Sequence, residues 1–462
     1  MMREELSRYE RTEAAWRLQE ADRVPVAPLN CYINAYRGGI SIREMFREPE
    51  KLTEATIRAR DILGYGDQED PNITTLDHLS FLGKSGWDRV TLHWRIWDEF
   101  PPAGNIPSFY ERVMIEDYDD VMTRGFATLL FNRQISPDVF ARSVDEFLYD
   151  EFEFPRRYAA AWRRFVEEQG VPLVMGGRAT IPFELVLYYR GFSQLAQDIA
   201  EQPEKVKAMC EFVLEHEIIN ALQQATIMGA GEVPGAERIF FQAGVVGPPY
   251  VSPRVFEEFV WPTLKQGVDM IVSRGYKAHV HMDGDLTPVL PTLKHIADGL
   301  PPGKVLLDFE KTDMKAAKQT LGDRVCLHGN VPAVLLCYGT PTEVDEHCRK
   351  LIADCAEGGG FILSTECETP WDARPENLRA MVASAQKYGR YASWRGTDMR
   401  EGVQRILEET RRGLRPPTEE EVSRARARWL FGKNAEKMMK YAPWSFVLTK
   451  LMWKKGEEPW AS

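Results

Sequence analysis

Short apolar segments alternate with longer amphipathic segments through most of the chain. The short segments have the length of buried strands and end in polar or glycine residues, whereas the longer ones repeat apolar residues every three or four positions, as helices do. The predicted strands are residues 24–29, 65–71, 171–181, 238–246, 277–285, 304–310, 324–331 and 361–367. Eight strands separated by helices close a parallel barrel, so we predict an α/β fold, the (β/α)8 or TIM barrel, for residues 1–394.

Helical periodicity places the main helices between these strands. Ser252 and Asp313 are predicted N-caps, because their side chains can accept hydrogen bonds from the first free backbone N–H groups of a helix. The predicted helices include residues 4–21, 41–63, 252–274, 313–321, 342–357 and 375–388.

Two regions depart from this alternation. Residues from about 74 to 155 are rich in aromatic and turn residues, and we interpret them as an insertion that supplies a lid or substrate walls. Residues 395–462 form a predicted C-terminal helical extension, with a capping-box pattern from Thr418 to Glu421 and an aromatic tail. That tail could pack on the barrel, cover a partner or form a dimer contact.

Composition narrows the function classes. The 462 residues are 44% hydrophobic and 27% charged, which is typical of a globular protein, and the net charge of −11 argues against a nucleic-acid partner. No apolar run approaches the roughly 18–20 residues of a membrane span, and the first residues lack the apolar core of a signal peptide, so we expect a cytoplasmic protein. The seven cysteines are scattered along the chain and form no CxxC pair, which argues against a disulfide framework. We interpret them as free thiols, one or two of which could be metal ligands.

The segment AHVHMDGD, residues 278–285, is the most unusual predicted strand. His279, His281, Asp283 and Asp285 alternate with other residues and would therefore point to one side of an extended chain. Burying two imidazoles and two carboxylates costs several kcal/mol unless a metal, a proton network or a polar ligand satisfies them. We interpret this segment as a barrel strand whose end opens into an active site.

A metal site assembled from several strands is the first chemical hypothesis. Its predicted ligands are His281, Asp283 and Cys367, with Glu310, Cys326 or His328 as alternatives for the third position. Imidazole, carboxylate and thiolate together suit zinc. The acidic neighbours of Cys367 would also raise the pKa of its thiol unless a cation were bound there.

Other polar and aromatic residues lie near predicted strand ends. Asn330, in the segment LHGNV, could contact a substrate or simply belong to a turn, and Arg178 could bind an anionic group or form a salt bridge. Tyr32, Phe241 and Trp371 could wall an apolar substrate, although aromatic residues are more often plain core.

Five ordered motifs carry a family resemblance that covers roughly residues 10–390. The chain resembles the uroporphyrinogen decarboxylase-like superfamily, which also includes zinc- and corrinoid-dependent methyltransferases. The motifs are DRVPVAP at 22–28, FEEFVWPTLKQ at 256–266, HMDGD at 281–285, LHGNVP at 327–332 and STECETPWDARPENLRAMV at 364–382.

The two branches of this superfamily differ in their motifs. The methyltransferase branch binds zinc through His-x-Cys-Gly and a later Cys; His281 and Cys367 match, whereas Asp283 replaces the middle Cys. A carboxylate there would make the ion a harder Lewis acid, better suited to polarising an oxygen. The decarboxylase branch carries an arginine-rich N-terminal signature that is absent here, where only Arg37 and Arg178 lie near strand ends.

The chain therefore looks like the first methyltransferase of an anaerobic O-demethylase. The resemblance implies transfer of a methyl group from a methoxyaromatic of the guaiacol or veratrole type to cobalamin on a separate corrinoid protein, with zinc or an acid stabilising the leaving phenolate. The catalytic residues it suggests are His281, Glu310 and His328. The alternatives are a decarboxylase-type lyase, a methyltransferase for another small donor and a non-catalytic binding barrel, and a homodimer is left open.

Overall fold

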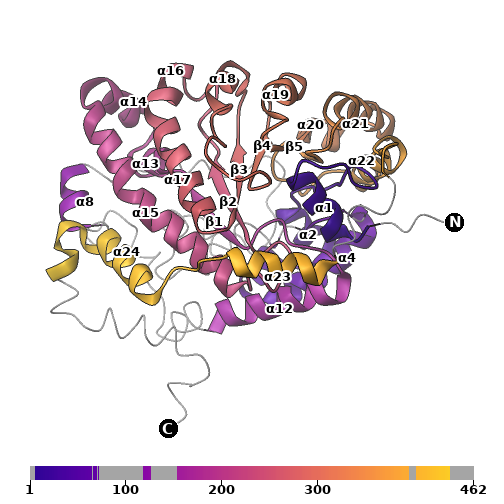
Figure 1. Cartoon of the computed structure of the whole chain (residues 1–462), viewed down its shortest axis with the longest axis horizontal. Helices are drawn as coiled ribbons and strands as arrows, with labels where there is room; N and C mark the ends of the chain where they lie inside the picture. Colours follow the sequence, from indigo (N-terminus) through magenta and orange to yellow (C-terminus); the bar gives the residue numbers. More distant parts are fainter. Residues whose placement is uncertain are drawn as a thin grey trace, which may run out of the picture.

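Six parallel strands form one sheet whose spatial order follows the sequence, from β1 to β6. Figure 1 labels the first five of them. The computed structural model describes residues 6–64, 66–69, 71, 118–125, 153–394 and 402–437. The strands are β1 (Gly177–Thr180), β2 (Arg238–Ala243), β3 (Lys277–Met282), β4 (Val305–Phe309), β5 (Cys326–Val331) and β6 (Phe361–Thr365).

Two extended segments near the N-terminus close this sheet into a ring. Val26 forms a parallel bridge with Leu363 of β6, and the backbone N–H of Asp67 donates to the carbonyl of Val26 at 2.6 Å. Glu69 then forms a parallel bridge with Leu173, just before β1. Together with the six strands, these two segments give eight parallel strand positions around the ring, which confirms the predicted α/β barrel. The two N-terminal segments form isolated bridges with their neighbours and are not full strands.

The helices surround this ring in the predicted alternation. The predicted helix at 41–63 is interrupted at Pro49, which lacks a backbone N–H and starts a new helix. The helices are α1 (Arg8–Trp16), α2 (Cys31–Gly38), α3 (Ile42–Arg47), α4 (Pro49–Leu63), α8 (Tyr118–Arg124), α12 (Phe154–Gln169), α13 (Pro182–Arg190), α14 (Phe192–Glu201), α15 (Pro203–Ile227), α16 (Pro253–Val255), α17 (Trp261–Ser273), α18 (Leu290–Leu293), α19 (Met314–Leu321), α20 (Ala333–Tyr338), α21 (Pro341–Cys355), α22 (Pro375–Tyr388), α23 (Val403–Gly413) and α24 (Glu419–Phe431).

Side-chain caps begin several helices where the sequence predicts them. The Asp313 carboxylate accepts from the backbone N–H groups of Lys315 and Ala316, and the Ser252 hydroxyl accepts from that of Val255. Thr418 forms the predicted capping box with Glu421 at the start of α24. The caps satisfy N–H groups that have no partner within the helix.

Alternation along the strands divides the interior into two cores. On β3, Ala278, Val280 and Met282 pack in the large apolar cluster between the sheet and the helices, while His279 and His281 lie on the opposite side, inside the ring. The four residues of the AHVHMDGD motif were predicted to share one side on this principle. The structure shows His279 and His281 doing so.

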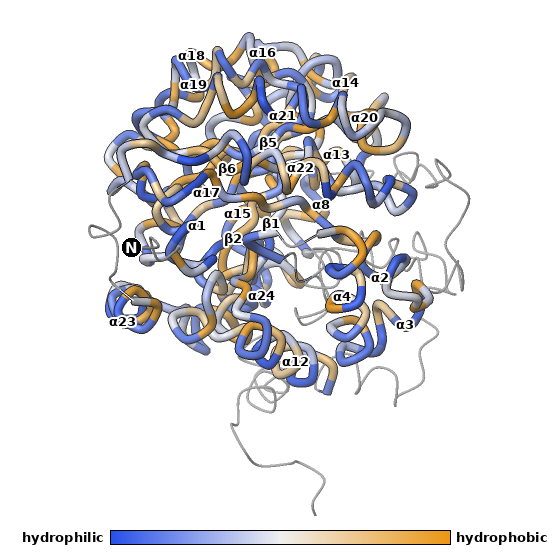
Figure 2. The backbone as a smooth tube through the Cα atoms, turned by 90° about the vertical axis from the view of Figure 1, so that its right-hand side faces the viewer, coloured by the Kyte–Doolittle hydropathy of each residue, from blue (hydrophilic) through white to orange (hydrophobic). Residues whose placement is uncertain are grey.

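The C-terminal extension contributes α23 and α24, while its last residues, like most of the predicted insertion at 74–155, lie outside the described residues. Val422 and Ala425 of α24 pack on Ile219 of α15, and Trp429 stacks on His216 at 4.8 Å between ring centroids. In both overall views α12, α23 and α24 lie along the lower edge, opposite α16, α18 and α19 (Figures 1 and 2). Among the described helices, none has the length and apolar character needed to cross a bilayer.

A buried ion cluster closes the amino end of the barrel. The Glu13 carboxylate of α1 accepts from Lys277 at 2.6 Å and from Arg238 at 3.0 Å, and the Trp16 ring lies against both cations. Burial alone would raise the pKa of Glu13, but Lys277 and Arg238 outweigh it and lower the pKa to about 2. The ion pairs of Glu13 with Lys277 and Arg238 thus hold α1 against the first residues of β2 and β3.

We predict that Glu13→Gln destabilises the fold. It leaves Lys277 and Arg238, two buried cations, with Glu237 as their one remaining carboxylate among the described residues, so the free energy of unfolding at pH 7 should fall by about 3–5 kcal/mol. Because the folded pKa lies below the unfolded value of about 4.3, the wild-type contribution is complete above that pH and is lost as the pH falls toward 2. Urea unfolding at several pH values would measure both effects.

A matched control is Glu409→Gln, which removes the exposed partner of Arg17 at 3.9 Å. That change should cost less than about 1 kcal/mol, because water screens exposed pairs. Equal losses for the two variants would contradict the assigned role of Glu13.

Candidate metal centre

The three predicted metal ligands lie together at the carboxyl end of the barrel. His281 ends the inward row of β3, Asp283 follows one residue beyond the strand, and Cys367 follows β6. The His281 Nε2 atom lies 2.9 Å from Asp283 Oδ1 and 3.5 Å from Cys367 Sγ. One ligand atom from each residue fits within 4.8 Å of the other two. We call these residues the rim cluster.

Backbone geometry explains how Asp283 reaches this position. Gly284 turns the chain directly after Asp283 with φ of +87°, a conformation that side chains with a Cβ rarely adopt. A Cβ at Gly284 would also lie 2.6 Å from the carbonyl oxygen of Pro248. Glycine is therefore required at the turn that directs the Asp283 carboxylate back toward His281.

Asp308 orients His281 and was missed in the sequence. It lies opposite His281 in the parallel register of β3 and β4, and its Oδ2 atom is 2.7 Å from His281 Nδ1. A carboxylate on one imidazole nitrogen fixes the ring and leaves the other nitrogen for a metal. The available signal was one acidic residue within the apolar strand VLLDF, at an inward position.

The charges around the rim cluster shift its protonation. Burial disfavours the imidazolium of His281, but the carboxylates of Asp308 and Asp283 outweigh burial and hold its pKa well above the ordinary value. Burial and the Asp283 charge raise the pKa of the Cys367 thiol to about 12. Without a cation both groups keep their protons at neutral pH, and a bound cation would replace them.

The donor set fits zinc. Zinc binds imidazole nitrogen, carboxylate oxygen and thiolate sulfur at about 2.0–2.3 Å and often keeps a fourth position open for chemistry. The spacing of the three ligand atoms allows one such ion between them. Among the described residues, Asp283 is the candidate third ligand that joins His281 and Cys367.

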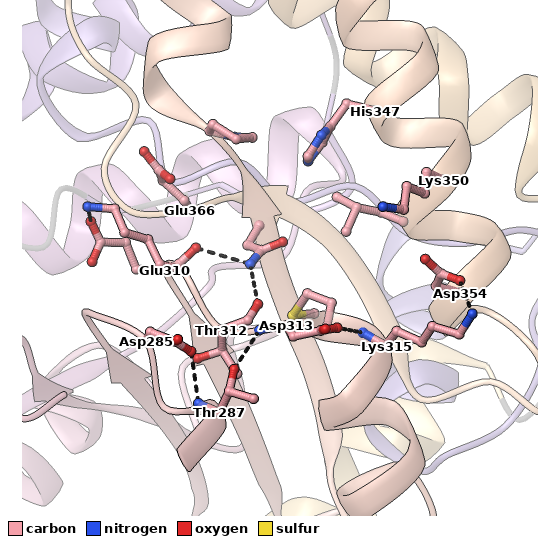
Figure 3. A pocket seen from close by; sticks show the side chains of 15 residues that line it. Asp285, Thr287, Glu310, Thr312, Asp313, Lys315, His347, Lys350, Asp354 and Glu366 are labelled. Carbon is pink, nitrogen blue, oxygen red and sulfur yellow. Dashed lines mark hydrogen bonds and ion pairs between the residues drawn. The ribbon is translucent and has the colours of Figure 1, made fainter. Parts of the chain in front are cut away.

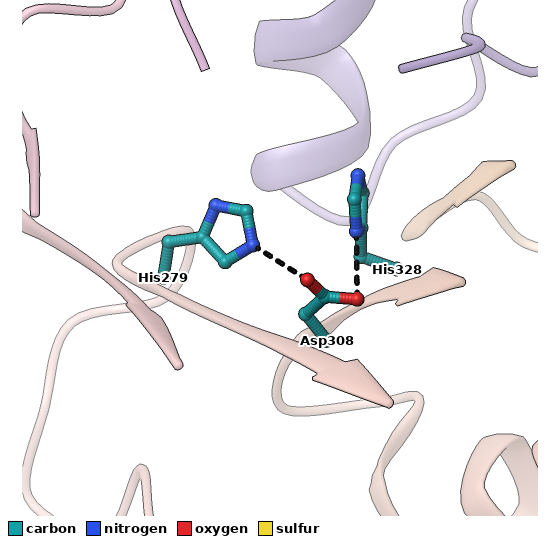
Figure 4. Close-up of side chains that lie close together, drawn as sticks. All are labelled: His279, Asp308 and His328. Carbon is teal, nitrogen blue, oxygen red and sulfur yellow. Dashed lines mark hydrogen bonds and ion pairs between the residues drawn. The ribbon is translucent and has the colours of Figure 1, made fainter. Parts of the chain in front are cut away.

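The alternative third ligands lie elsewhere. Cys326 is buried deeper in the barrel, packed with Leu306 and Ile362. His328 lies on the other side of Asp308, 2.9 Å from its Oδ1 atom, with His279 nearby (Figure 4). Glu310 stands at the edge of the barrel mouth, where its Oε2 atom accepts from the backbone N–H of Gly284 at 2.6 Å.

A cleft of about 480 Å³, lined mainly by polar residues that follow β3, β4 and β5, includes Glu310 and Asn330 (Figure 3). Glu310 pairs with Lys311 at 3.0 Å at one end, and Glu366 lies near it. The predicted substrate residue Asn330 instead donates to the backbone carbonyls of Glu310 and Thr312, both at 3.0 Å, and so holds the loop after β4. Among the described residues, the lining of this cleft contains no Phe, Tyr or Trp.

Arg178 belongs to a hydrogen-bonded chain across the first strands. Its Nε atom donates to Gln242 at 3.1 Å, and Gln242 donates to the buried carboxylate of Glu184 at 2.8 Å. Burial raises the pKa of Glu184, and it likewise raises that of Glu368, a carboxyl close enough to feel the charge of Arg178. Arg178 is thus buried at the level of Phe240 and His279 and is already engaged by protein groups.

The predicted aromatic walls divide into two groups. Tyr32 and Trp371 pack edge to face at 6.4 Å between ring centroids, beside the loop that carries Cys367. The prediction for Phe241 was wrong: it lies outside the ring, against Gly267 of α17, because strand alternation turns it toward the helices. Its neighbour Phe240 faces inward and stacks on His281 at 5.3 Å.

We predict that Cys367→Ala lowers the zinc content by one equivalent per chain. Loading the wild type at pH 7 should also release about two protons more than loading this variant, because His281 and Cys367 must both deprotonate. Elemental analysis and titration in a weakly buffered solution measure the two quantities. Cys337→Ala, which changes a partly buried thiol on α20, should leave both unchanged.

Asp308→Asn should weaken zinc binding at the rim about 10- to 100-fold while Cys367 remains in place, because the amide orients the imidazole less firmly. Competition with a chromophoric chelator would measure the affinity. An unchanged affinity would show that the Asp308 contact with His281 is unimportant for the metal.

Comparisons with known proteins agree with this architecture. A solved methyltransferase from Methanosarcina mazei superposes with a TM-score of 0.54 at 16% sequence identity, covering 83% of this chain and 99% of that one, which supports the fold alone. Two proteins named uroporphyrinogen decarboxylase are also similar. That of Methylococcus capsulatus is 31% identical over 77 residues, or 17% of this chain and 22% of its own length. That of Psychromonas ingrahamii is 27% identical over 263 residues, which are 53% of this chain and 68% of the length of that protein.

The family model for uroporphyrinogen decarboxylase (URO-D) matches residues 148–388, which are 241 of the 462 residues. This match contains all six strands of the sheet and every member of the rim cluster. The chain belongs to the uroporphyrinogen decarboxylase (URO-D) family.

Proposed function

We propose that this chain is a methyltransferase that moves a methyl group from a methoxyaromatic compound to the cob(I)alamin of a corrinoid protein. The observation that carries the proposal is the convergence of His281, Asp283 and Cys367 at the barrel mouth, with His281 held by Asp308. The solved protein of the same fold is named a methyltransferase, which is consistent with this choice.

The chemical difficulty of the reaction is its leaving group. As the methyl carbon passes to cobalt, the carbon–oxygen bond breaks and the phenolate departs with the bonding electron pair. When bound at the rim cluster, zinc would supply Lewis-acid stabilisation of the negative charge that develops on that oxygen. Asp283, as a carboxylate in place of a thiolate, favours this oxygen chemistry.

The protein residues have distinct tasks in this scheme. Asp308 fixes the ring of His281, so that Nε2 stays directed at Asp283 and Cys367. Glu310 lies at the mouth with its carboxylate engaged by Gly284 and Lys311, whereas His328 is fully buried behind Asp308. Of the two acids suggested for the phenolate, Glu310 is therefore the one nearer to an entering substrate.

The exposure of the site suits a reaction with a second protein. The Asp283 side chain is 25% exposed, while the His281 side chain beneath it is 5% exposed. A substrate placed over Asp283 could keep its methyl group directed outward, in line with a nucleophile that approaches from the solvent. A closed pocket would not allow that approach.

The choice of a methoxyaromatic donor rests on aromatic residues. The Tyr32 and Trp371 pair lies beside the Cys367 loop and offers an edge-to-face surface for a ring. The aromatic insertion that favoured this donor in the sequence lies outside the described residues. Methanol, methylamines and methylthiols are therefore included as donors in the test.

Decarboxylation of a tetrapyrrole is the second candidate function, favoured by the family model and by the names of both curated relatives. A substrate with many carboxylates needs several arginines directed into the site. Arg178 donates to Gln242, and Arg37 donates to the backbone carbonyl of Ala373 at 2.8 Å. Neither arrangement favours a polycarboxylate over the methyl transfer proposed here.

Zinc-loaded protein incubated anaerobically with cob(I)alamin and a panel of methyl donors should convert cob(I)alamin to methylcobalamin with a methoxyaromatic donor. The visible spectrum of cobalt follows the reaction. Cys367→Ala should lower the rate at least 100-fold, because it removes a ligand of the ion that eases phenolate departure, whereas Cys337→Ala should react like the wild type.

The same preparation should also be tested with uroporphyrinogen. Decarboxylation without metal, together with no methyl transfer from any donor, would overturn the proposal in favour of the second candidate.

A further inference from the structure

A second group of ligand-type side chains lies deeper in the barrel than the rim cluster. His279, Asp308 and His328 come from three neighbouring strands, and their side chains are 2%, 0% and 0% exposed. One ligand atom from each lies within 4.8 Å of the others. Figure 4 shows the Asp308 carboxylate between the two rings, with one oxygen toward each. We call these residues the inner cluster.

His328 is the unusual member of the inner cluster. Its Nδ1 atom is 2.9 Å from Asp308 Oδ1, yet within the described part of the chain neither ring nitrogen, nor that oxygen, makes a hydrogen bond of acceptable direction. Buried polar atoms nearly always have a partner. A nitrogen and an oxygen that both coordinate one metal ion can lie about 3 Å apart without a hydrogen bond between them, because their lone pairs are directed at the ion.

Among the described residues, the surroundings of the inner cluster are mainly apolar and aromatic. Phe240 packs on His279 at 4.9 Å between ring centroids, and Trp16 meets the same ring at 6.4 Å. Leu306 and Cys326, each two residues before a cluster member on its strand, pack with Trp16 and Ile362 in an apolar group. An apolar shell of this kind strengthens the binding of a cation to the ligands that it encloses, because water does not compete.

We propose that His279, Asp308 and His328 hold a second divalent transition-metal ion inside the barrel. Two imidazoles and one carboxylate suit zinc or ferrous iron better than calcium or magnesium, which prefer all-oxygen sites. The site is distinct from the rim cluster, because it contains no thiolate and shares no ligand with it. The inference does not depend on methyl transfer.

Asp308 links the two sites. Its Oδ2 atom contacts His281 Nδ1 at 2.7 Å, while its Oδ1 atom faces His328. A cation bound to Oδ1 would withdraw electron density from the Asp308 carboxylate and so weaken its hydrogen bond to His281. Occupation of the inner cluster should therefore weaken the bond between His281 and its own metal and make that ion more electrophilic.

Metal counting on intact protein tests the proposal. Protein stripped with a chelator, reloaded with zinc and desalted should contain two equivalents per chain by elemental analysis. Cys367→Ala should retain one equivalent, held by the inner cluster, and His328→Asn should lose the inner equivalent. His347→Asn is the matched control, since its Nε2 atom is also buried without a partner in the described structure but lies outside both clusters.

Cobalt substitution distinguishes the two sites spectroscopically. The wild type and His328→Asn should show a thiolate-to-cobalt charge-transfer band, which Cys367→Ala should lack. Cys367→Ala should keep the weaker ligand-field absorption of cobalt bound by nitrogen and oxygen, and this absorption should disappear in the double variant Cys367→Ala with His328→Asn.

A Cys367→Ala protein that folds but retains no zinc would overturn the proposal, as would a His328→Asn protein with the wild-type metal content. The Cys367→Ala arm changes only the partly exposed rim, so it remains decisive if His328→Asn fails to fold. If the rim cluster binds no metal at all, the wild type and Cys367→Ala would both contain one equivalent, which still supports the inner site.

Discussion

The carboxylate of Asp308 is the charge on which the interior of this barrel depends. It is the fourth of the five residues of β4, is fully buried, and faces three imidazoles from the two neighbouring strands. Burial alone would raise the pKa of Asp308, but the charges and hydrogen bonds of these histidines outweigh burial and keep the carboxyl ionised. An ionised group at this position determines which nitrogen each ring presents, and so determines where the donor atoms of both clusters point.

The ends of the barrel use charge in different ways. At the amino end two carboxylates, Glu13 and Glu237, match the two cations Lys277 and Arg238, and the result is a closed ion cluster that anchors α1. At the carboxyl end the acidic residues exceed the basic ones around Asp283, and burial raises the pKa of Glu184, Glu366 and Glu368. A site with surplus carboxyl groups and a buried thiol is arranged to receive a cation or protons, whereas the amino end is already neutralised.

Membership of the URO-D family fixes the fold of the chain and leaves its chemistry to individual residues. The family match and the superposed methyltransferase share the barrel with this protein. By the motif resemblance described from the sequence, Asp283 replaces a thiolate, and its carboxylate would change the character of an ion held with His281 and Cys367. In the function proposed above, this one residue would separate a thiol-activating site from one suited to oxygen leaving groups.

The sequence alone determined the parts of this protein that follow from local periodicity. Strand and helix alternation predicted the barrel, and Ser252, Asp313 and Thr418 predicted helix starts that the structure confirms. The inward row of β3 also follows from alternation. Only the tertiary structure decided that Asp308 supports His281, that Asp283 and not Cys326 joins His281 and Cys367, and that Phe240 rather than Phe241 faces inward. Those relations depend on the register between strands and on the path of the loops beyond them, which are set by packing of distant segments and leave no signal within any one segment.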